Sequence, residues 1–272
     1  MTELLGHSDY SVAKSLTEEA FWPEMLSSIN SAWQRDRLAI KQYCKKRNIK
    51  WLCHFTDAAN LRSLFNNGIK SRRLLANESL EYSRIDTSSK LYFEDFNYLS
   101  ISSPNTKMLH TKYMKGIWVA VVVLDVKLLW EMPFFSIPMN SAKGQMRTLM
   151  NTDYVQFLGY SGLRALFGNH ELREKCKVPM SEPTDIQSEL IFLSTISNNY
   201  FRHVCLTPID KTSQNFLSVA KDFGFFESGT KAKYEWKWLT RETIDSWGPE
   251  YSAEAKECYN LRKWNEDWNS NG

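Results

Sequence analysis

The stretch IKWLCHFTDAANLRSLFNNGI, residues 49–69, decides the fold. Trp51 to Phe55 predicts a short strand, and Thr56 or Asp57 caps a helix that runs to about Phe65 with its apolar residues at helical spacing. Gly68 is suited to the left-handed position that ends such a helix. A strand that gives way at once to a helix places the side chains at its end beside a possible cleft.

His54 and Thr56 lie at that junction. Residues two apart on a strand face the same side, so both side chains can donate to the hydroxyl groups of one ligand. The alternative is a structural histidine whose ring is satisfied by backbone groups. The residues alone leave both interpretations open.

The rest of the chain predicts an α+β fold with a mixed sheet. Short strands alternate with helices and long loops, without the regular crossover helices of a doubly wound parallel sheet. Residues 8–48 are expected to be helical, with Trp33, Leu38 and Tyr43 as the buried stripe of a second helix. Other expected elements are strands at 98–102, 116–125, 188–193 and 203–207, a helix at 106–113, an extended return at 69–75, an irregular loop at 76–97, and an edge segment near 127–135.

Composition narrows the class of protein. The 272 residues are 43% hydrophobic and carry a formal net charge of +3, which favours a folded domain and neither requires nor excludes nucleic acid. The five Cys form no CxxC pair, so no metal site is expected. The N-terminus lacks an apolar signal segment and the run Ile117 to Leu124 is too short to span a bilayer, so a cytoplasmic location without membrane contact is expected. Neither common phosphate-binding glycine loop occurs.

Three further groups could carry chemistry. Glu189 enters an apolar strand, which is costly for a carboxylate unless it is paired, solvated or functional, and Gln187 shares its face. The SISSPN turn, Ser100 to Asn105, lets a ligand approach the backbone. The arginine guanidinium matches the geometry of a phosphate group, so three arginines are candidates for binding phosphate. Each could equally be a solvated surface residue. These are Arg72, Arg73 and Arg84.

The order of these pieces resembles the DarT family, bacterial toxins that ADP-ribosylate bases of single-stranded DNA. The matching segments are HFT, NNGI, YLSISSPNTKM, VAVVVLD and PTDIQSELIFL, within about Trp51 to Thr207. SISSPNTKM and PTDIQSE look closest to the guanine-modifying branch.

The resemblance implies an ADP-ribosyltransferase-like split mixed sheet, surrounded by helices, with NAD in the central cleft. It implies that Glu189 is the catalytic glutamate, that Arg84 assists it, and that Gln187 contacts the acceptor. It also implies NAD-binding roles for His54, Thr56, Arg72, Arg73, Tyr98, Ser100 and Ser102.

The expected activity is therefore NAD-dependent mono-ADP-ribosylation, by a toxin, of a base in single-stranded nucleic acid. Guanine is favoured over other bases and DNA over RNA, with Tyr98 or Trp118 as a candidate stacking platform. Alternatives are a messenger-RNA base in anti-phage defence, a protein side chain, or a non-enzymatic nucleic-acid-binding module. The resemblance also implies an antitoxin, either a macrodomain hydrolase or a direct inhibitor. We expect one domain over 1–272, with 1–48 as a helical N-terminal extension and about 208–272 as a C-terminal extension.

Overall fold

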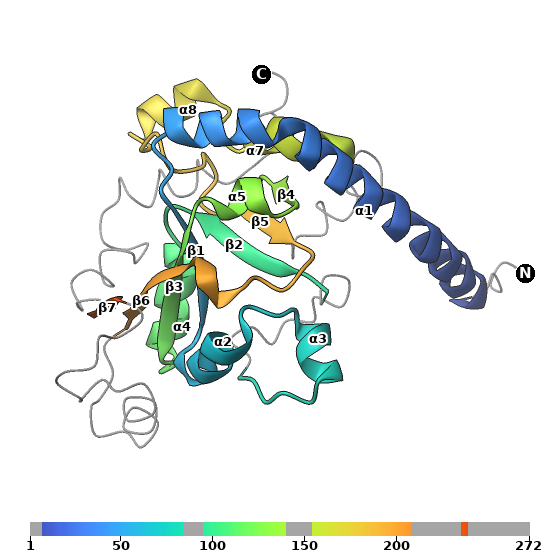
Figure 1. Ribbon diagram of the computed structural model, residues 1–272, viewed down its shortest axis with the longest axis horizontal. Helices are drawn as coiled ribbons and strands as arrows, with labels where there is room; N and C mark the ends of the chain where they lie inside the picture. Colours follow the sequence, from blue (N-terminus) through green and yellow to red (C-terminus); the bar gives the residue numbers. More distant parts are fainter. Residues whose placement is uncertain (1–6, 84–94, 140–153, 208–234, 239–272) are drawn as a thin grey trace, which may run out of the picture.

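The computed structural model describes the backbone of residues 7–83, 95–139, 154–207 and 235–238. Side chains are described from residue 23 onward, except at 107 and 235–238. The described residues form one mixed sheet with helices packed around it, as Figure 1 shows. This confirms the α+β class. The strands are β1 (Trp51–Asp57), β2 (Asn97–Ile101), β3 (Val119–Asp125), β4 (Phe134–Ile137), β5 (Glu189–Phe192), β6 (Phe201–Leu206) and β7 (Glu235–Trp238).

Across the described sheet the strand order is β4-β5-β2-β1-β3-β6-β7. Every neighbouring pair is antiparallel except β6 and β7, which are parallel. The β3 strand alternates between two cores: Val122 and Leu124 enter one, and Val121 and Val123 enter the other. Because both faces are covered, the strand reads as a continuous β-branched run, as the sequence predicted.

The sheet splits between β1 and β2. These strands pair only at Leu52 with Ile101 and at Cys53 with Ser100. Beyond that point β1 continues along β3, from His54 to Asp57, whereas β2 continues along β5. The two halves therefore diverge from a common closed end and leave an opening at the C-terminal end of β1.

Helices cover both faces. Leu109 of α4 packs on the core beneath β1 and β3, whereas α1, α2 and α5 contribute to the opposite core. The helices are α1 (His7–Lys46), α2 (Leu61–Asn67), α3 (Arg72–Asn77), α4 (Thr106–Met114), α5 (Leu128–Glu131), α7 (Gly159–Ala165) and α8 (His170–Lys175), with 3₁₀ turns η1 (Ala58–Asn60), η2 (Tyr154–Phe157) and η3 (Asn198–Tyr200).

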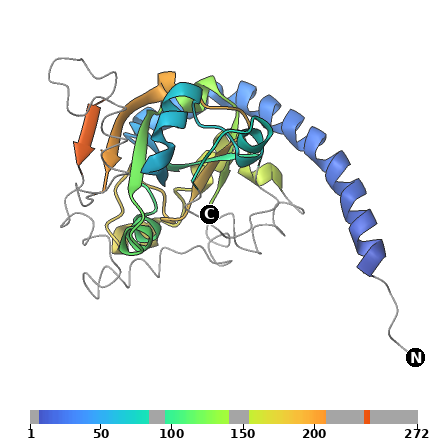
Figure 2. The same cartoon turned by 90° about the horizontal axis from the view of Figure 1, so that it is seen from below.

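Helix α1 corrects one prediction. It is a single helix of 40 residues, about 60 Å long, that continues through Pro23 rather than two separate helices. Its C-terminal half lies along the body and its N-terminal half extends away from it (Figure 2). The predicted buried stripe is right at Trp33 and Tyr43 but wrong at Leu38, which is 67% exposed. A side chain five positions after Trp33 lies well off the buried face of a helix with 3.6 residues per turn.

The buried face of α1 makes this segment part of the core. Met25, Ile29 and Ile40 are fully buried, and the Trp33 indole donates to the carbonyl of Leu129 in α5. The helix also packs against α7 and β4. The N-terminal extension is thus packed against the sheet from residue 25 onward.

The segment after α2 corrects a second prediction. Gly68 ends α2 with a positive φ of 77°, but its ψ of −173° is not that of the left-handed helical position that the sequence predicted. Ile69 pairs with Ile196. The chain then forms α3 rather than an extended return, because Ser71 caps a new helix by accepting from the Leu74 amide. Residues 84–94 of the predicted loop lie outside the described residues.

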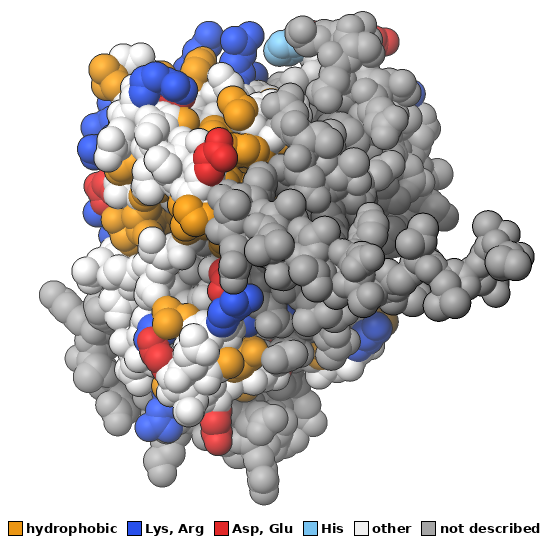
Figure 3. Space-filling view, turned by 90° about the vertical axis from the view of Figure 1, so that its right-hand side faces the viewer, with side chains coloured by type: hydrophobic (Ala, Val, Ile, Leu, Met, Phe, Trp, Pro, Cys, Tyr) orange, Lys and Arg blue, Asp and Glu red, His pale blue; other side chains and the backbone are white. Residues whose placement is uncertain are grey.

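The described surface shows no field of one sign on the face drawn in Figure 3, where basic, acidic and apolar side chains are interspersed. Across the described part of the chain, no helix is both long enough and apolar enough to cross a membrane.

Candidate active site

A cleft occupies the opening between the two halves of the sheet. The empty space within it, open mouth and solvent included, is about 1250 Å³. We call β1 through α3, residues 51–77, together with Tyr82 and Ser83, the first wall, and β2 with β5 the second wall. The polar residues of the lining are His54, Thr56, Asn60, Ser63, Lys70, Arg72, Tyr82, Ser83, Asn97, Tyr98, Ser100 and Glu189.

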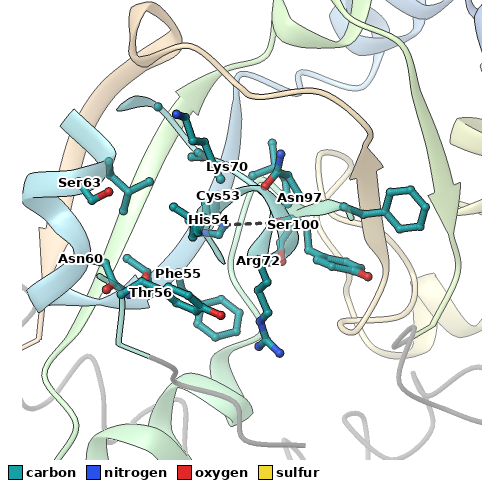
Figure 4. Close-up of a pocket in the computed structure, with 18 of the residues that line it drawn as sticks. Cys53, His54, Phe55, Thr56, Asn60, Ser63, Lys70, Arg72, Asn97 and Ser100 are labelled. Carbon is teal, nitrogen blue, oxygen red and sulfur yellow. Dashed lines mark hydrogen bonds between the residues drawn. The ribbon is translucent and has the colours of Figure 1, made fainter. Parts of the chain in front are cut away.

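His54 bridges the two walls where their ladder ends. Its Nδ1 lies 3.1 Å from the Tyr98 carbonyl oxygen, and because a carbonyl only accepts, Nδ1 carries the proton (Figure 4). Burial lowers the pKa of His54, against a smaller opposing effect of this hydrogen bond. The ring is therefore neutral near pH 7, and Nε2 is an acceptor. The prediction that His54 donates to a ligand is corrected: its remaining nitrogen accepts.

Thr56 is held by a network at the start of the first wall. Its Oγ1 accepts from Asn60 Nδ2 at 2.9 Å, so the hydroxyl proton of this buried side chain remains available for a ligand. The same Asn60 amide donates to the Ser83 carbonyl and accepts from the Ser83 amide, while Ser83 Oγ donates to Asp57. These bonds fix the Tyr82–Ser83 backbone at the rim of the cleft.

Two cations belong to the first wall. Lys70 and Arg72 both line the cleft, and Lys70 also pairs with Glu78. Arg72 is the first residue of α3, and Figure 4 shows it among the lining residues. Arg73 does not line the cleft. It pairs instead with Asp95, at 2.8 Å between Nε and Oδ1, and its side chain is 58% exposed.

The second wall contributes Tyr98, Ser100 and Glu189. Glu189 is the first residue of β5, opposite Ile137 of β4, and it is partly exposed. Strand β5 pairs antiparallel with β2, which sets the Glu189 end of β5 beside the β2 residues of the cleft. A carboxylate thus meets the space that His54, Thr56 and Arg72 line from the opposite wall.

Cys53 also lines the cleft but cannot act as a nucleophile at neutral pH. Burial, with smaller contributions from Cys205 and Glu182, raises the pKa of its thiol to about 12. The thiolate form that attacks carbon is therefore absent near pH 7.

Several predicted residues lie outside this lining. Ser102, with a positive φ of 62°, donates through Oγ to the Ser181 carbonyl at 2.6 Å. The backbone amide of Gln187 donates to Asp185 Oδ1 at 2.7 Å, two residues before Glu189. Trp118 is 7% exposed and its indole donates to the Thr207 carbonyl, so it offers no free face for stacking. Arg84 falls outside the described residues.

Other lining residues escaped the sequence analysis, notably Asn60, Lys70, Ser83 and Asn97. Asn60 stands four positions after Thr56, a spacing that brings side chains together in a helical turn and could have identified it. Asn97 is buried and donates to the Ser194 carbonyl, a partner 97 residues away that no local pattern reveals.

The cleft offers hydrogen-bonding groups and cations, and its Cys53, His54 and Glu189 do not gather into a metal-binding group. No group of three His, Cys, Asp or Glu residues that could hold a metal occurs within the described ranges.

Comparisons with known proteins add a likeness to a solved structure. No protein-family model matches the chain, and no curated protein is similar to it in sequence. The fold is similar to a solved structure of Thermosipho africanus DarTG in complex with ADP-ribose, at 11% sequence identity and a TM-score of 0.45. The likeness covers 72% of this chain and 50% of that one, so the chain spans about half the length of that protein.

Proposed function

We propose that the protein is an NAD-dependent mono-ADP-ribosyltransferase that modifies a base in single-stranded nucleic acid. The observation that supports this most is the convergence of separate sequence motifs on one cleft. His54 and Thr56 from β1, Tyr98 and Ser100 from β2, and Glu189 from β5 line the same opening. Those motifs are the ones in which the sequence resembles DarT enzymes.

Glu189 fits the chemistry of this transfer. The bond between nicotinamide and ribose breaks with oxocarbenium character, so positive charge develops on the sugar, and a fixed carboxylate stabilises it. Nicotinamide leaves with the electron pair of that bond, and a base nitrogen then bonds to the anomeric carbon. The proton lost from the acceptor passes to the carboxylate of Glu189.

The first wall fits the other parts of NAD. The neutral His54 ring can accept from a ribose hydroxyl or from the carboxamide of nicotinamide, while the Thr56 hydroxyl can donate. Lys70 and Arg72 supply positive charge for the diphosphate. These residues would bind NAD without taking part in bond breaking.

The class of acceptor is inferred from whether the reactive edge of a base is exposed. Watson–Crick edges are hidden in a duplex, so a single strand is the natural substrate. Of the two aromatic residues expected from the sequence to stack a base, Tyr98 lines the cleft and is partly exposed, whereas Trp118 is buried, so we favour Tyr98. Guanine in DNA is the acceptor that we favour, on the resemblance of SISSPNTKM and PTDIQSE alone. The resemblance also suggests that Gln187 contacts the acceptor and that Arg84 assists Glu189.

The same resemblance supports a wider setting. We infer a cytoplasmic toxin that is opposed by an antitoxin, either a macrodomain hydrolase that removes the modification or a direct inhibitor. Defence against phage is a consistent role.

The test is incubation of the purified chain and NAD with single-stranded DNA, single-stranded RNA and whole-cell protein, followed by mass spectrometry. We expect an ADP-ribose adduct on a guanine of the DNA. Adducts confined to RNA or to protein would instead support those acceptors, and NAD binding without turnover would indicate a non-enzymatic module. A comparison with Glu189→Gln assigns any adduct to this cleft.

A further inference from the structure

A buried arginine outside the cleft forms hydrogen bonds to the segment of chain that leads into Glu189. Arg173 of α8 is 6% exposed, and its guanidinium lies over the Phe167 ring, 5.5 Å from the ring centroid. One nitrogen, Nη1, donates to the Glu182 carbonyl at 2.8 Å and to Thr184 Oγ1 at 3.1 Å. The other, Nη2, donates to the Pro179 carbonyl at 2.7 Å. A single side chain thus fixes three positions of the 179–188 segment.

This segment is held from two further directions. The fully buried Thr184 hydroxyl donates to the Gly168 carbonyl at 2.6 Å, and the Thr184 amide donates to the Leu166 carbonyl. On the opposite side, Ser102 beyond the end of β2 donates to the Ser181 carbonyl. The segment contains no helix or strand, so these contacts take the place of a regular hydrogen-bond ladder.

The segment ends at the residues that the proposed transfer requires. Gln187 lies three positions after Thr184, and Glu189 begins β5 two positions later. The hydrogen bonds of Arg173 to Pro179, Glu182 and Thr184 act on the chain that leads into the second wall.

We propose that Arg173 is a positioning residue for the acceptor step: it fixes the 179–188 segment and thereby sets where an acceptor base lies relative to Glu189. The inference rests on the proposed function. Ser102 assists from the other side of the segment, which gives it a positioning role in place of the cofactor contact expected from the sequence. NAD, held mainly by the first wall, does not depend on Arg173.

The three hydrogen-bond acceptors around residue 173 require an arginine, and another cation would not satisfy them. The guanidinium is a rigid planar fork that donates in several fixed directions, whereas a lysine ammonium is a compact charge on a flexible stem. Arg173→Lys therefore keeps the charge but cannot hold Pro179, Glu182 and Thr184 together. Arg164→Lys is the matched control, because Arg164 is exposed on the neighbouring helix α7.

Partitioning between transfer and hydrolysis is the measurement that separates positioning from general stability. When no base is placed correctly, water takes the same position: its oxygen bonds to the anomeric carbon, one of its protons is lost, and free ADP-ribose and nicotinamide result. The experiment uses the full chain and measures both the ADP-ribosylated oligonucleotide and free ADP-ribose. Calorimetry gives the NAD dissociation constant of each variant, and thermal denaturation gives its unfolding midpoint.

We expect Arg173→Lys to lower kcat for transfer to single-stranded oligonucleotides by about tenfold to a hundredfold. The share of NAD lost to hydrolysis rises, while the NAD dissociation constant stays within about twofold of wild type. Ser102→Ala is expected to shift the partition in the same direction by a smaller factor, and Arg164→Lys to leave it unchanged.

Two results would overturn the inference. One is that the wild type is active and the Arg173→Lys variant has the same kcat for transfer and the same ratio of transfer to hydrolysis. The other is a variant in which NAD affinity, transfer and the unfolding midpoint all fall together, since that indicates general loss of structure. A wild type that modifies no oligonucleotide contradicts the proposed function itself, and the inference with it.

Discussion

The two walls of the cleft are built differently. In the first wall the functional side chains come from one short stretch, and Thr56 is fixed by Asn60, four residues away. In the second wall Glu189 follows a segment that is fixed by Arg173 and Ser102, from two other parts of the chain. The first wall is therefore set by local structure and the second by tertiary contacts. We infer that changes in the first wall act on NAD binding and changes in the second act on the transfer.

Glu189→Gln tests the second wall with the largest expected effect. The change removes a negative charge from a partly exposed strand end, so the fold should remain while transfer falls by about 10²–10³-fold or more. Adduct formation and the thermal unfolding midpoint measure the two consequences. Transfer at the wild-type rate would remove Glu189 from the mechanism.

Gly68→Ala tests the junction of the first wall with the rest of the sheet. A Cβ at this position would overlap the Ile196 carbonyl oxygen, and the φ of 77° is strained for alanine. We expect a loss of about 1–3 kcal/mol in the free energy of unfolding, measured by urea denaturation. Gly116→Ala is the control, since Gly116 shares the positive φ but has open space around it. Equal losses in the two variants would mean that the overlap contributes nothing.

Arg72→Ala and Arg73→Ala form a matched pair in the first wall. Arg72 lines the cleft, so its loss should weaken NAD binding by about tenfold, the value of one charge-assisted hydrogen bond. Arg73 is an exposed partner of Asp95, so its loss should change NAD affinity less than twofold. Calorimetry with each variant decides the matter, and the reverse order of effects would restore Arg73 to the site.

The smallest expected effect is the pH dependence that His54 confers. Burial lowers its pKa in the folded state below the usual 6.5, so the unfolded chain binds more protons between those two values. The stability from a neutral His54 is present in full above pH 6.5 and is lost as the pH falls through the folded pKa. NAD binding should weaken only as the pH falls to the lowered pKa of the folded chain, because protonation of the folded His54 removes the Nε2 acceptor there. His54→Asn should flatten both profiles, and an unchanged acid limb in that variant would assign the titration to another group.

The same contrast explains how far the sequence could be read. Most element ends were predicted to within one or two residues, because alternation, capping and β-branched runs are local signals. Examples are the strands predicted at 51–55, 98–102 and 188–193 and the helix after SSPN. The capped helix at Arg72 was missed, although Ser71 carried the signal for it. Leu38 was misjudged because its spacing from Trp33 does not fit a period of 3.6 residues per turn. Trp118 was misjudged because its burial depends on Thr207 and other neighbours that are distant in sequence.

By itself, the sequence determined the mixed α+β fold, the ends of most strands, and the His54–Thr56 pair at the end of β1. Each depends on residues within one or two turns of each other. Tertiary structure alone decided that β1 and β2 diverge after two residue pairs, that the His54 ring spans the split to Tyr98, and that Arg173 holds the approach to Glu189. Those contacts join segments far apart in the chain, where no periodic pattern links one residue to its partner.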